Sequence, residues 1–322
     1  MARVLITGAT GCLGARLVDT CLHAGDDVIA IGRDTLAGAQ LSVQGAHFVH
    51  HDLTQPLPAR HLYGVDTVYH CAALSSAWGD PRTFQAVNVT ATAALLRIAQ
   101  QAGVGRFVFA SSPSIYANGA DRLNLPEDAP LPKVFASHYA RTKFLAEQLV
   151  MSSDNPRGMR TTAMRPRAIY GTGDRSLMPR LLAAMQRGKV PMIAGGGALV
   201  DITHVSDAAR AMHLLGHHPA AGGQVFNITS GETLSFGQIL QTVSQLRGLS
   251  VREVRLPYSA AMAIASVLEG AHRIFAPLRE PVLTRQAVAS LGRSLTLNIE
   301  KARSQLGYQP QTTLQQGVQD YA

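Results

Sequence analysis

Short apolar runs alternate with helix-like segments through the first half of the chain. Helical periodicity occurs at 13–24, 84–101 and 137–151. The apolar runs, each short enough for a buried strand, lie at 3–6, 28–31, 46–49, 67–70, 106–110 and 162–165. Continuous apolar strands that alternate with helices are typical of a parallel sheet covered on both faces. With right-handed crossovers, this pattern predicts an α/β fold with a doubly wound, Rossmann-like parallel sheet.

The second half of the chain is less regular. Helical patterns lie at 177–186, 207–215 and 236–247, and a strand-like alternation at 199–205. Asn298 is the expected N-cap of a last helix that runs through Arg303, with Gly307 and Pro310 beyond its end. These elements predict a smaller, mainly C-terminal lobe beside the sheet.

Length and composition fit two folded lobes. At about 150 residues per domain, the 322 residues suggest two structural units. Hydrophobic residues make up 46% and charged residues 16%, so the chain can bury a core and is not disordered. We expect a dinucleotide-binding domain at 1–170 and a substrate-binding lobe at 171–322, with part of 200–228 returning to the first domain.

The cysteine count, the N-terminal residues and the charge restrict the cellular compartment and the partners that we expect for the protein. An odd cysteine count without metal-ligand spacing fits a reducing compartment better than secretion. The first residues read as a strand and a turn rather than as a signal peptide, so we expect a cytoplasmic protein. The formal net charge is +8. The basic residues are scattered, whereas a nucleic-acid surface gathers them on one face, so we expect no nucleic-acid partner.

Residues 259–277 form the most apolar stretch of the second half. The stretch contains Glu269, His272 and Arg273, which makes it too charged for a membrane span. We expect a helix that covers the substrate pocket. The alternative is a peripheral membrane contact through an apolar face flanked by basic residues.

A glycine-rich turn follows the first predicted strand. Residues 7–14 read TGATGCLG and open the first predicted helix. Glycines allow a tight turn and close approach to a pyrophosphate, and the helix N-terminus offers free N–H groups to the anion. Because strand and helix flank the turn as required, we predict a dinucleotide site. Its expected contacts are Gly8, Thr10, Gly11, Cys12, Leu13 and Gly14.

The end of the second strand predicts a preference for NADP(H) over NAD(H). Proteins that prefer NAD carry an acidic residue there for the ribose 2′-hydroxyl. Here Gly32 takes that position and Arg33 follows, and a guanidinium can bind a 2′-phosphate. Two alternatives stay open: Arg33 stacks on adenine and both cofactors work, or Asp34 takes the acidic role. Further expected cofactor contacts follow the third and fourth strands: Asp52, Leu53, Ala72 and Ala73.

Tyr139 and Lys143 stand four residues apart in the predicted helix 137–151. This spacing places them on one helix face, about 6 Å apart along the axis. A nearby ammonium favours tyrosinate and lowers the tyrosine pKa from about 10. We therefore predict that Tyr139 acts as a general acid/base and that Lys143 also holds the nicotinamide ribose. A hydroxyl of the serine pair at 111–112 is expected to bind the substrate oxygen.

Together these motifs resemble the extended short-chain dehydrogenase/reductases of the NAD-dependent epimerase/dehydratase superfamily. The chain is most similar to the 3β-hydroxysteroid dehydrogenase-like branch and, within it, to bacterial 2-alkyl-3-oxoalkanoate reductases. The resemblance covers nearly the whole chain. It rests on TGATGCLG at 7–14, ASSPSIY at 110–116, YARTK at 139–143, RPRAIYGTGD at 165–174, DITHVSDAA at 201–209 and LGYQP at 306–310.

The resemblance implies a catalytic set in which Tyr139 is the acid/base and Lys143 its partner. The catalytic hydroxyl falls on Ser112, with Ser111 or Ser114 as alternatives. Pro166 would border the nicotinamide. Asn88 matches an asparagine at the start of a family helix, but residues 88–92 read NVTAT and depart from the family pattern. That departure leaves the role of Asn88 open.

We interpret the chain as an NADPH-dependent oxidoreductase that interconverts a ketone and a secondary alcohol. The expected substrate is a bulky, apolar small molecule, either a β-keto acid or a 3-keto/3β-hydroxysteroid. Its candidate contacts are Trp78, Ser114 and Arg167, and Trp78 also fits a core position. If the substrate has a carboxylate, we expect it to bind Arg167, Arg175 or Arg180.

Two other functions remain as alternatives. One is a nucleotide-sugar epimerase or dehydratase with tightly bound NAD, and the other is a non-catalytic regulator that senses NADP. We expect no metal site, because His204 and Asp201 lack a third ligand nearby in the sequence. The family resemblance also implies a homodimer.

Overall fold

A parallel sheet of seven strands organises the N-terminal part of the protein in the computed structural model, which describes residues 1–276 and 279–321. Its strands are β1 Arg3–Thr7, β2 Asp27–Gly32, β3 His47–His50, β4 Thr67–His70, β5 Arg106–Ala110, β7 Arg160–Pro166 and β12 Gln224–Ile228. They lie in the order β12-β7-β5-β4-β1-β2-β3. Each neighbouring pair is parallel. The predicted doubly wound parallel sheet is confirmed.

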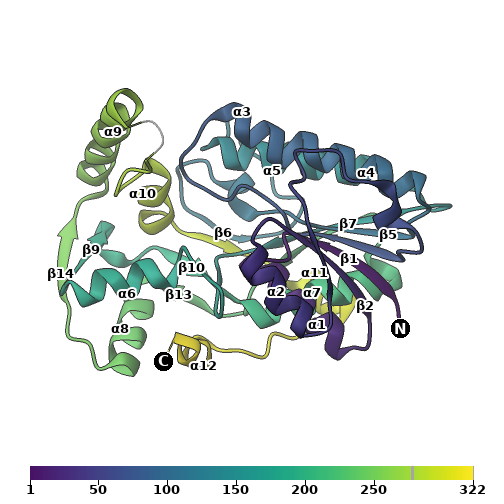
Figure 1. The fold of residues 1–322 in the computed structure, drawn as a ribbon. Helices are drawn as coiled ribbons and strands as arrows, with labels where there is room; N and C mark the ends of the chain where they lie inside the picture. The colour runs from purple at the N-terminus through teal and green to yellow at the C-terminus, as the bar shows by residue number, and fades with distance from the viewer. Residues whose placement is uncertain (277–278, 322) are drawn as a thin grey trace.

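Helices cover both faces of this sheet (Figure 1). One face carries α3 Pro81–Phe84, α4 Ala91–Gln101 and α5 His138–Ser152, and the other carries α1 Cys12–His23, α2 Thr35–Val43, α7 Val205–His217 and α11 Glu300–Leu306. Side chains alternate between the two cores. Val4 and Ile6 pack with the α1 and α7 side, and Leu5 packs with the α4 and α5 side. Burial on both faces explains why the first strand is apolar at successive positions.

The last strand of the sheet comes from the second half of the chain. The hydrophobic pattern predicts no strand at β12, because residues 224–228 read QVFNI and include two amides. In the structure Asn227 is fully buried, and its Nδ2 donates to the carbonyls of Leu125 at 2.9 Å and Asn298 at 3.3 Å. A buried amide with these partners is tolerated in a core strand. Helix α7, which precedes β12, packs on α1.

The remaining elements form a second layered region beside the sheet (Figure 1). A four-stranded sheet contains β13 Thr233–Ser235, β10 Leu199–Asp201, β15 Leu295–Leu297 and β6 Arg122–Leu125. Two small pairs are β8 Ile169–Tyr170 with β11 Thr203–His204, and β9 Lys189–Ile193 with β14 Arg252–Leu256. The helices are α6 Met178–Gln186, α8 Phe236–Arg247, α9 Tyr258–Phe275, α10 Arg285–Gly292 and α12 Leu314–Gly317. Because β6 precedes α5 in the chain, the first half also contributes to this region.

Two predicted elements are interrupted. The strand expected at 199–205 divides into β10 and β11, and α7 begins at Val205 because the His204 side chain accepts from the Ser206 N–H as its N-cap. The helix expected at 84–101 contains a π-helical turn, Gln85–Thr90, between α3 and α4. Such turns widen a helix locally, and they occur often at functional sites.

The last predicted helix starts and ends later than expected. Asn298 is not its N-cap. That position is Ile299, and Asn298 Oδ1 accepts from the Glu300 N–H at 2.8 Å just before α11. The helix continues to Leu306, and Gly307 follows with φ +65°, the left-handed conformation in which glycine commonly ends a helix.

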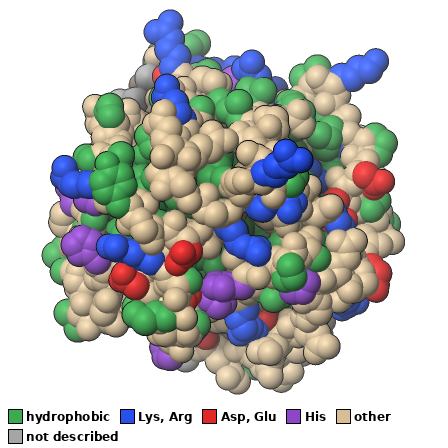
Figure 2. Space-filling view, turned by 90° about the vertical axis from the view of Figure 1, so that its right-hand side faces the viewer, with side chains coloured by type: hydrophobic (Ala, Val, Ile, Leu, Met, Phe, Trp, Pro, Cys, Tyr) green, Lys and Arg blue, Asp and Glu red, His purple; other side chains and the backbone are tan. Residues whose placement is uncertain are grey.

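The surface has two features that bear on partners. No helix in the described part of the chain is both long and apolar enough to cross a membrane. Within the predicted apolar segment 259–277, residues up to Phe275 belong to α9, and Pro277 lies outside the described residues. Figure 2 shows one face of the molecule, on which Lys and Arg side chains are distributed among hydrophobic, histidine and other side chains.

Candidate active site

The glycine turn between β1 and α1 forms a narrow backbone cradle. Gly8 has φ +66°, and a Cβ there would lie 2.7 Å from the Cα of Ala72. A Cβ on Gly14 would overlap the Gly8 carbonyl. Gly11 is the N-cap of α1 and supplies no side-chain hydrogen bond, so the first N–H groups of the helix can bind an external anion. The turn therefore fits the pyrophosphate of a dinucleotide.

The other predicted cofactor residues follow neighbouring strands of the same sheet edge. The carboxyl ends of β7, β5, β4 and β1 are adjacent because these strands are neighbours. A Cβ on Gly32 would lie 2.7 Å from Thr10 Cγ2, so the ends of β1 and β2 pack closely. Pro166 is buried as the last residue of β7. The remaining predicted contacts are partly buried: Cys12, Leu13, Leu53, Ala72 and Ala73.

At the end of β2, Arg33 is exposed, whereas the Asp34 side chain forms a hydrogen bond at the start of α2. The Arg33 side chain is 71% exposed, and its Nη1 lies 4.0 Å from Asp52 Oδ2 on the next strand's loop. Asp34 Oδ1 accepts from the Ala37 N–H at 3.0 Å and caps α2. The alternative role of Asp34 as a ribose ligand would compete with this cap, whereas Arg33 is available to a ligand.

Tyr139 and Ser112 meet at the carboxyl edge of the sheet. Tyr139 is partly buried and forms a hydrogen bond with Ser112. Ser112 donates to Ser114 Oγ at 2.9 Å. Ser111 points elsewhere and donates to Glu147 Oε2 at 2.6 Å. Of the two adjacent serines, only Ser112 therefore has its hydroxyl at the predicted acid/base.

Lys143 shares the helix face of Tyr139, but its ammonium is directed to the end of β5. Its buried Nζ donates to the Ala110 carbonyl oxygen at 2.5 Å and lies 4.0 Å from the centre of the Phe109 ring. Burial lowers the pKa of Lys143 to about 7. Burial raises the pKa of Tyr139, while the hydrogen bond with Ser112 acts in the opposite direction. The prediction of a lowered Tyr139 pKa is wrong, because desolvation of the phenol outweighs this hydrogen bond.

A buried ion pair holds α5 against the sheet, and the sequence analysis missed it. Arg165 Nε donates to Glu147 Oε2 at 2.9 Å, and its Nη2 pairs with Oε1. Both side chains are almost fully buried. A signal was present, because Glu147 continues the four-residue spacing of Tyr139 and Lys143 on one helix face. The pair joins β7 to the helix that carries Tyr139 and Lys143.

A cleft of about 1180 Å³ opens beside Tyr139. Trp78 lines it, with the Arg273 guanidinium 5.8 Å from its ring centre. Glu269 and Arg273 bring α9 to its rim. Much of the wall is apolar, comprising Ala77, Trp78, Pro81, Phe84, Val134 and Phe135. The cleft is large enough for a drug-sized or lipid-like ligand.

Arg167 and Asn88 lie near this region without lining the cleft. Arg167 follows β7, and its Nε is buried without a hydrogen-bond partner among the described residues. Asn88 lies in the π-helical turn, where Nδ2 donates to Thr142 Oγ1 at 3.0 Å and Oδ1 accepts from the Leu74 N–H at 2.7 Å. Asn88 therefore ties the loop after β4 to α5.

One group of metal-type side chains lies away from the candidate site. Ligand atoms of Cys21, Asp26 and His213 are within 4.8 Å of one another. His213 Nε2 lies 3.1 Å from Asp26 Oδ2, and Asp26 Oδ1 accepts from the Ala2 N–H at 3.0 Å. Burial raises the pKa of the Cys21 thiol, which disfavours the thiolate that binds metals. The three side chains are therefore explained by hydrogen bonds and packing inside the protein.

Comparison with known proteins supports the predicted family. Residues 4–229 match the NAD dependent epimerase/dehydratase family. The chain is 32% identical to a 4-hydroxy-2-methyl-3-oxo-4-farnesyl-3,4-dihydroquinoline-1-oxide ketoreductase of Stigmatella aurantiaca, covering 98% of this chain and 94% of that protein. It is 30% identical to a 2-alkyl-3-oxoalkanoate reductase of Stenotrophomonas maltophilia (strain K279a), covering 98% and 97%.

A solved structure agrees with these relatives. The structure of MoeE5 in complex with UDP-glucuronic acid and NAD superposes with a TM-score of 0.77 and 28% sequence identity, covering 99% of this chain and 97% of that one. The predicted resemblance to extended short-chain dehydrogenase/reductases is confirmed. With a family match across most of its length and curated relatives of equal extent, this chain belongs to the NAD dependent epimerase/dehydratase family.

Proposed function

We propose that this protein is an NADPH-dependent reductase of a ketone on a bulky, apolar small molecule. The observation that carries the proposal is the position of Tyr139. It lines a large cleft with an apolar wall, hydrogen-bonds Ser112, and lies at the same sheet edge as the glycine turn, which is the proposed dinucleotide site. Two relatives named as reductases of keto compounds support the same chemistry.

The residues of this chain divide the work as follows. The raised pKa keeps Tyr139 protonated at neutral pH, the form that donates a proton to a developing alkoxide. Ser112 orients the substrate oxygen toward that phenol. Lys143 holds α5 to the end of β5 through the Ala110 carbonyl, and its proposed ligand is the nicotinamide ribose. When bound, the reduced nicotinamide supplies the hydride for the carbonyl carbon.

The preference for NADP(H) rests on Arg33. Its exposed guanidinium can bind a 2′-phosphate. Position 32 is a glycine, so the acidic residue that is typical of NAD sites is missing there and would not repel this phosphate. The test compares kcat/KM for NADPH and NADH with one ketone substrate. A clear advantage for NADPH is expected, and an advantage for NADH would overturn this part of the proposal.

The substrate class follows from the cleft and one arginine. The apolar wall favours alkyl chains or a steroid skeleton. Of three arginines considered for a carboxylate, Arg175 and Arg180 face Asp34 and Glu280. Arg167 interacts with the charge of Asp201, but its buried Nε has no hydrogen-bond partner among the described residues. We favour a β-keto acid whose carboxylate meets Arg167, a contact that requires the Arg167 side chain to turn toward the cleft that it does not line. NADPH oxidation should be measured with 2-alkyl-3-keto acids, their methyl esters and 3-ketosteroids, and equal rates with acids and esters would contradict this role.

A nucleotide-sugar epimerase is the second candidate. The MoeE5 structure, which contains UDP-glucuronic acid and NAD, favours it. That function predicts NAD that copurifies with the protein and thermal protection by a UDP-sugar. Neither is expected from a ketoreductase that exchanges NADPH at each turnover. A nucleotide extract of the purified protein, analysed by mass spectrometry, distinguishes the two.

The outer face of α9 supports a peripheral membrane contact. Val267 and Ile274 are 72% and 74% exposed, and Ile264 lies about one turn before Val267 on the same face. Arg273 precedes Ile274 in α9, Arg279 lies beyond the end of that helix, and both are exposed, so an anionic lipid surface complements this end of the molecule. Flotation with vesicles that contain phosphatidylglycerol should recover the protein, and Val267→Asp should abolish recovery. A dimer that Val267→Asp dissociates, without vesicle binding, would instead assign this face to a second copy.

A further inference from the structure

A loop from the second region crosses the dinucleotide end of the sheet. This covering loop, residues 171–175, follows β8 and precedes α6. A Cβ on Gly173 would lie 3.4 Å from the Cα of Cys12 in the glycine turn, and Cys12 Sγ lies 3.7 Å from the Thr172 carbonyl. At its far end, Arg175 lies 3.9 Å from Asp34 after β2. The loop therefore spans the two places where a dinucleotide's pyrophosphate and adenosine ribose are expected.

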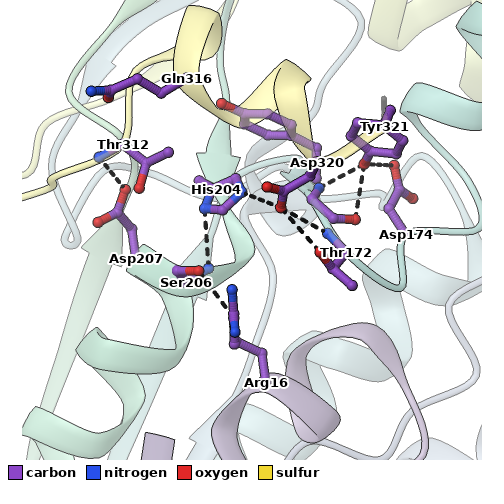
Figure 3. A network of polar contacts seen from close by, with 12 residues as sticks. Arg16, Thr172, Asp174, His204, Ser206, Asp207, Thr312, Gln316, Asp320 and Tyr321 are labelled. Atoms are coloured by element: carbon purple, nitrogen blue, oxygen red, sulfur yellow. Dashed lines mark hydrogen bonds and ion pairs between the residues drawn. The ribbon is translucent and has the colours of Figure 1, made fainter. Parts of the chain in front are cut away.

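Asp320 and Tyr321, near the C-terminus, bind the first residues of this loop (Figure 3). Asp320 Oδ2 accepts from the Thr172 N–H at 3.2 Å, from Thr172 Oγ1 at 3.1 Å and from His204 Nε2 at 3.0 Å. The Tyr321 hydroxyl accepts from the Gly171 N–H at 2.6 Å and donates to the Gly171 carbonyl at 2.9 Å. Both ends of the first peptide of the loop are thus bound by the last residues of the chain.

His204 is set up to donate to Asp320. Its Nδ1 accepts from the Ser206 N–H at 3.4 Å, so the proton of a neutral imidazole lies on Nε2, which faces the Asp320 carboxylate (Figure 3). Partial burial would raise the pKa of Asp320, but hydrogen bonds from His204 and Thr172 lower it below its ordinary value. At neutral pH the carboxylate is therefore charged and accepts from the covering loop.

We propose that Asp320 and Tyr321 are positioning residues for the dinucleotide. They act through the covering loop, which they hold across the N-terminus of α1. The loop is exposed at Thr172, Gly173 and Arg175 and buried at Gly171 and Asp174. Both buried residues contact the Tyr321 hydroxyl, so the C-terminal residues cover the loop where it is buried. The inference rests on the dinucleotide site of the proposed function and adds that the C-terminus controls cofactor affinity and release.

The test measures NADPH binding by fluorescence titration and stopped-flow displacement. The variants are Asp320→Ala, Tyr321→Phe and, as a matched control on the same tail, Gln316→Ala, whose side chain bonds to Thr313. We expect Kd and the dissociation rate to rise about tenfold in the first two variants, equivalent to about 1.4 kcal/mol. The control should remain near wild type. At saturating NADPH, kcat should be unchanged, because neither residue touches the reacting atoms.

Hydrogen exchange and melting temperature separate positioning from folding. Residues 171–175 should exchange faster in Asp320→Ala, and NADPH should protect them less than in the wild type. Tyr321→Phe removes only a hydroxyl, so it remains informative if Asp320→Ala unfolds. An unchanged Kd in a folded variant with a loosened loop would overturn the inference. Failure of the wild type to bind NADPH or NADH would refute the proposed dinucleotide site itself, and this inference with it.

Discussion

Lys143 Nζ donates a hydrogen bond to the Ala110 carbonyl oxygen at 2.5 Å, which places the ammonium of α5 at the last residue of β5. The contact shows how a helix residue is held at the carboxyl edge of the sheet. Its buried ammonium is costly, because burial lowers the pKa of Lys143 to about 7. The same contact fixes the position of α5 relative to the sheet. The position of Tyr139, one turn earlier in this helix, therefore depends on it.

Stability should rise with pH above neutrality because of Lys143. Its pKa is about 7 in the folded protein and about 10.4 in an unfolded chain. Between these values the unfolded chain binds more protons, so unfolding becomes harder as pH increases, by up to about 1.4 kcal/mol per pH unit. Lys143→Met should remove this part of the slope. Urea unfolding of both proteins at pH 7, 8 and 9 measures it, and parallel profiles would contradict the lowered pKa.

Replacing Tyr139 with phenylalanine should abolish proton donation while leaving the cofactor site intact. We expect Tyr139→Phe to lower kcat about 10²- to 10⁴-fold, the usual contribution of a general acid. NADPH binding, followed by fluorescence, should change little. Tyr63→Phe is the control, because Tyr63 is an exposed tyrosine. Normal turnover in Tyr139→Phe would remove this phenol from the mechanism.

The buried pair of Glu147 and Arg165 should dominate the stability of α5. Glu147→Ala leaves a buried guanidinium without its carboxylate, and such losses cost about 3–5 kcal/mol. The partly exposed pair of Arg16 and Asp19 is the comparison, and Asp19→Ala should cost less than about 1 kcal/mol. Denaturant midpoints for both variants provide the measurement. Similar losses would mean that burial does not distinguish the two pairs.

Arg33 should discriminate between the two cofactors. Removing a charged hydrogen bond to a 2′-phosphate costs about 1.5–3 kcal/mol, so Arg33→Ala should raise the KM for NADPH by about tenfold or more. The KM for NADH, which lacks that phosphate, should stay within about twofold. Arg97→Ala removes another exposed arginine, on α4, and serves as the control. Equal effects on both cofactors would show that Arg33 contacts the shared part of the dinucleotide.

Local patterns were sufficient for six of the seven strands of the sheet and for its ligand edge. The apolar runs of β1, β2, β4 and β5 and the glycine turn follow from neighbours in the chain, because strand burial and tight turns depend on residues a few positions apart. The four-residue spacing of Tyr139 and Lys143 likewise places them on one face of α5 without tertiary information. The fold class and the candidate catalytic helix could therefore be read from the sequence.

Tertiary structure decided the contacts between distant segments and the environment of each charge. Strand β12 joins the sheet although its own pattern is weak, because Asn227 finds partners on other segments. Glu147 meets Arg165, and Asp320 meets Thr172, across separations that no periodicity encodes. The pKa of Tyr139 rises rather than falls, because it depends on desolvation. Local sequence sets which side chains share a face, whereas folding sets what they face and how much water remains there.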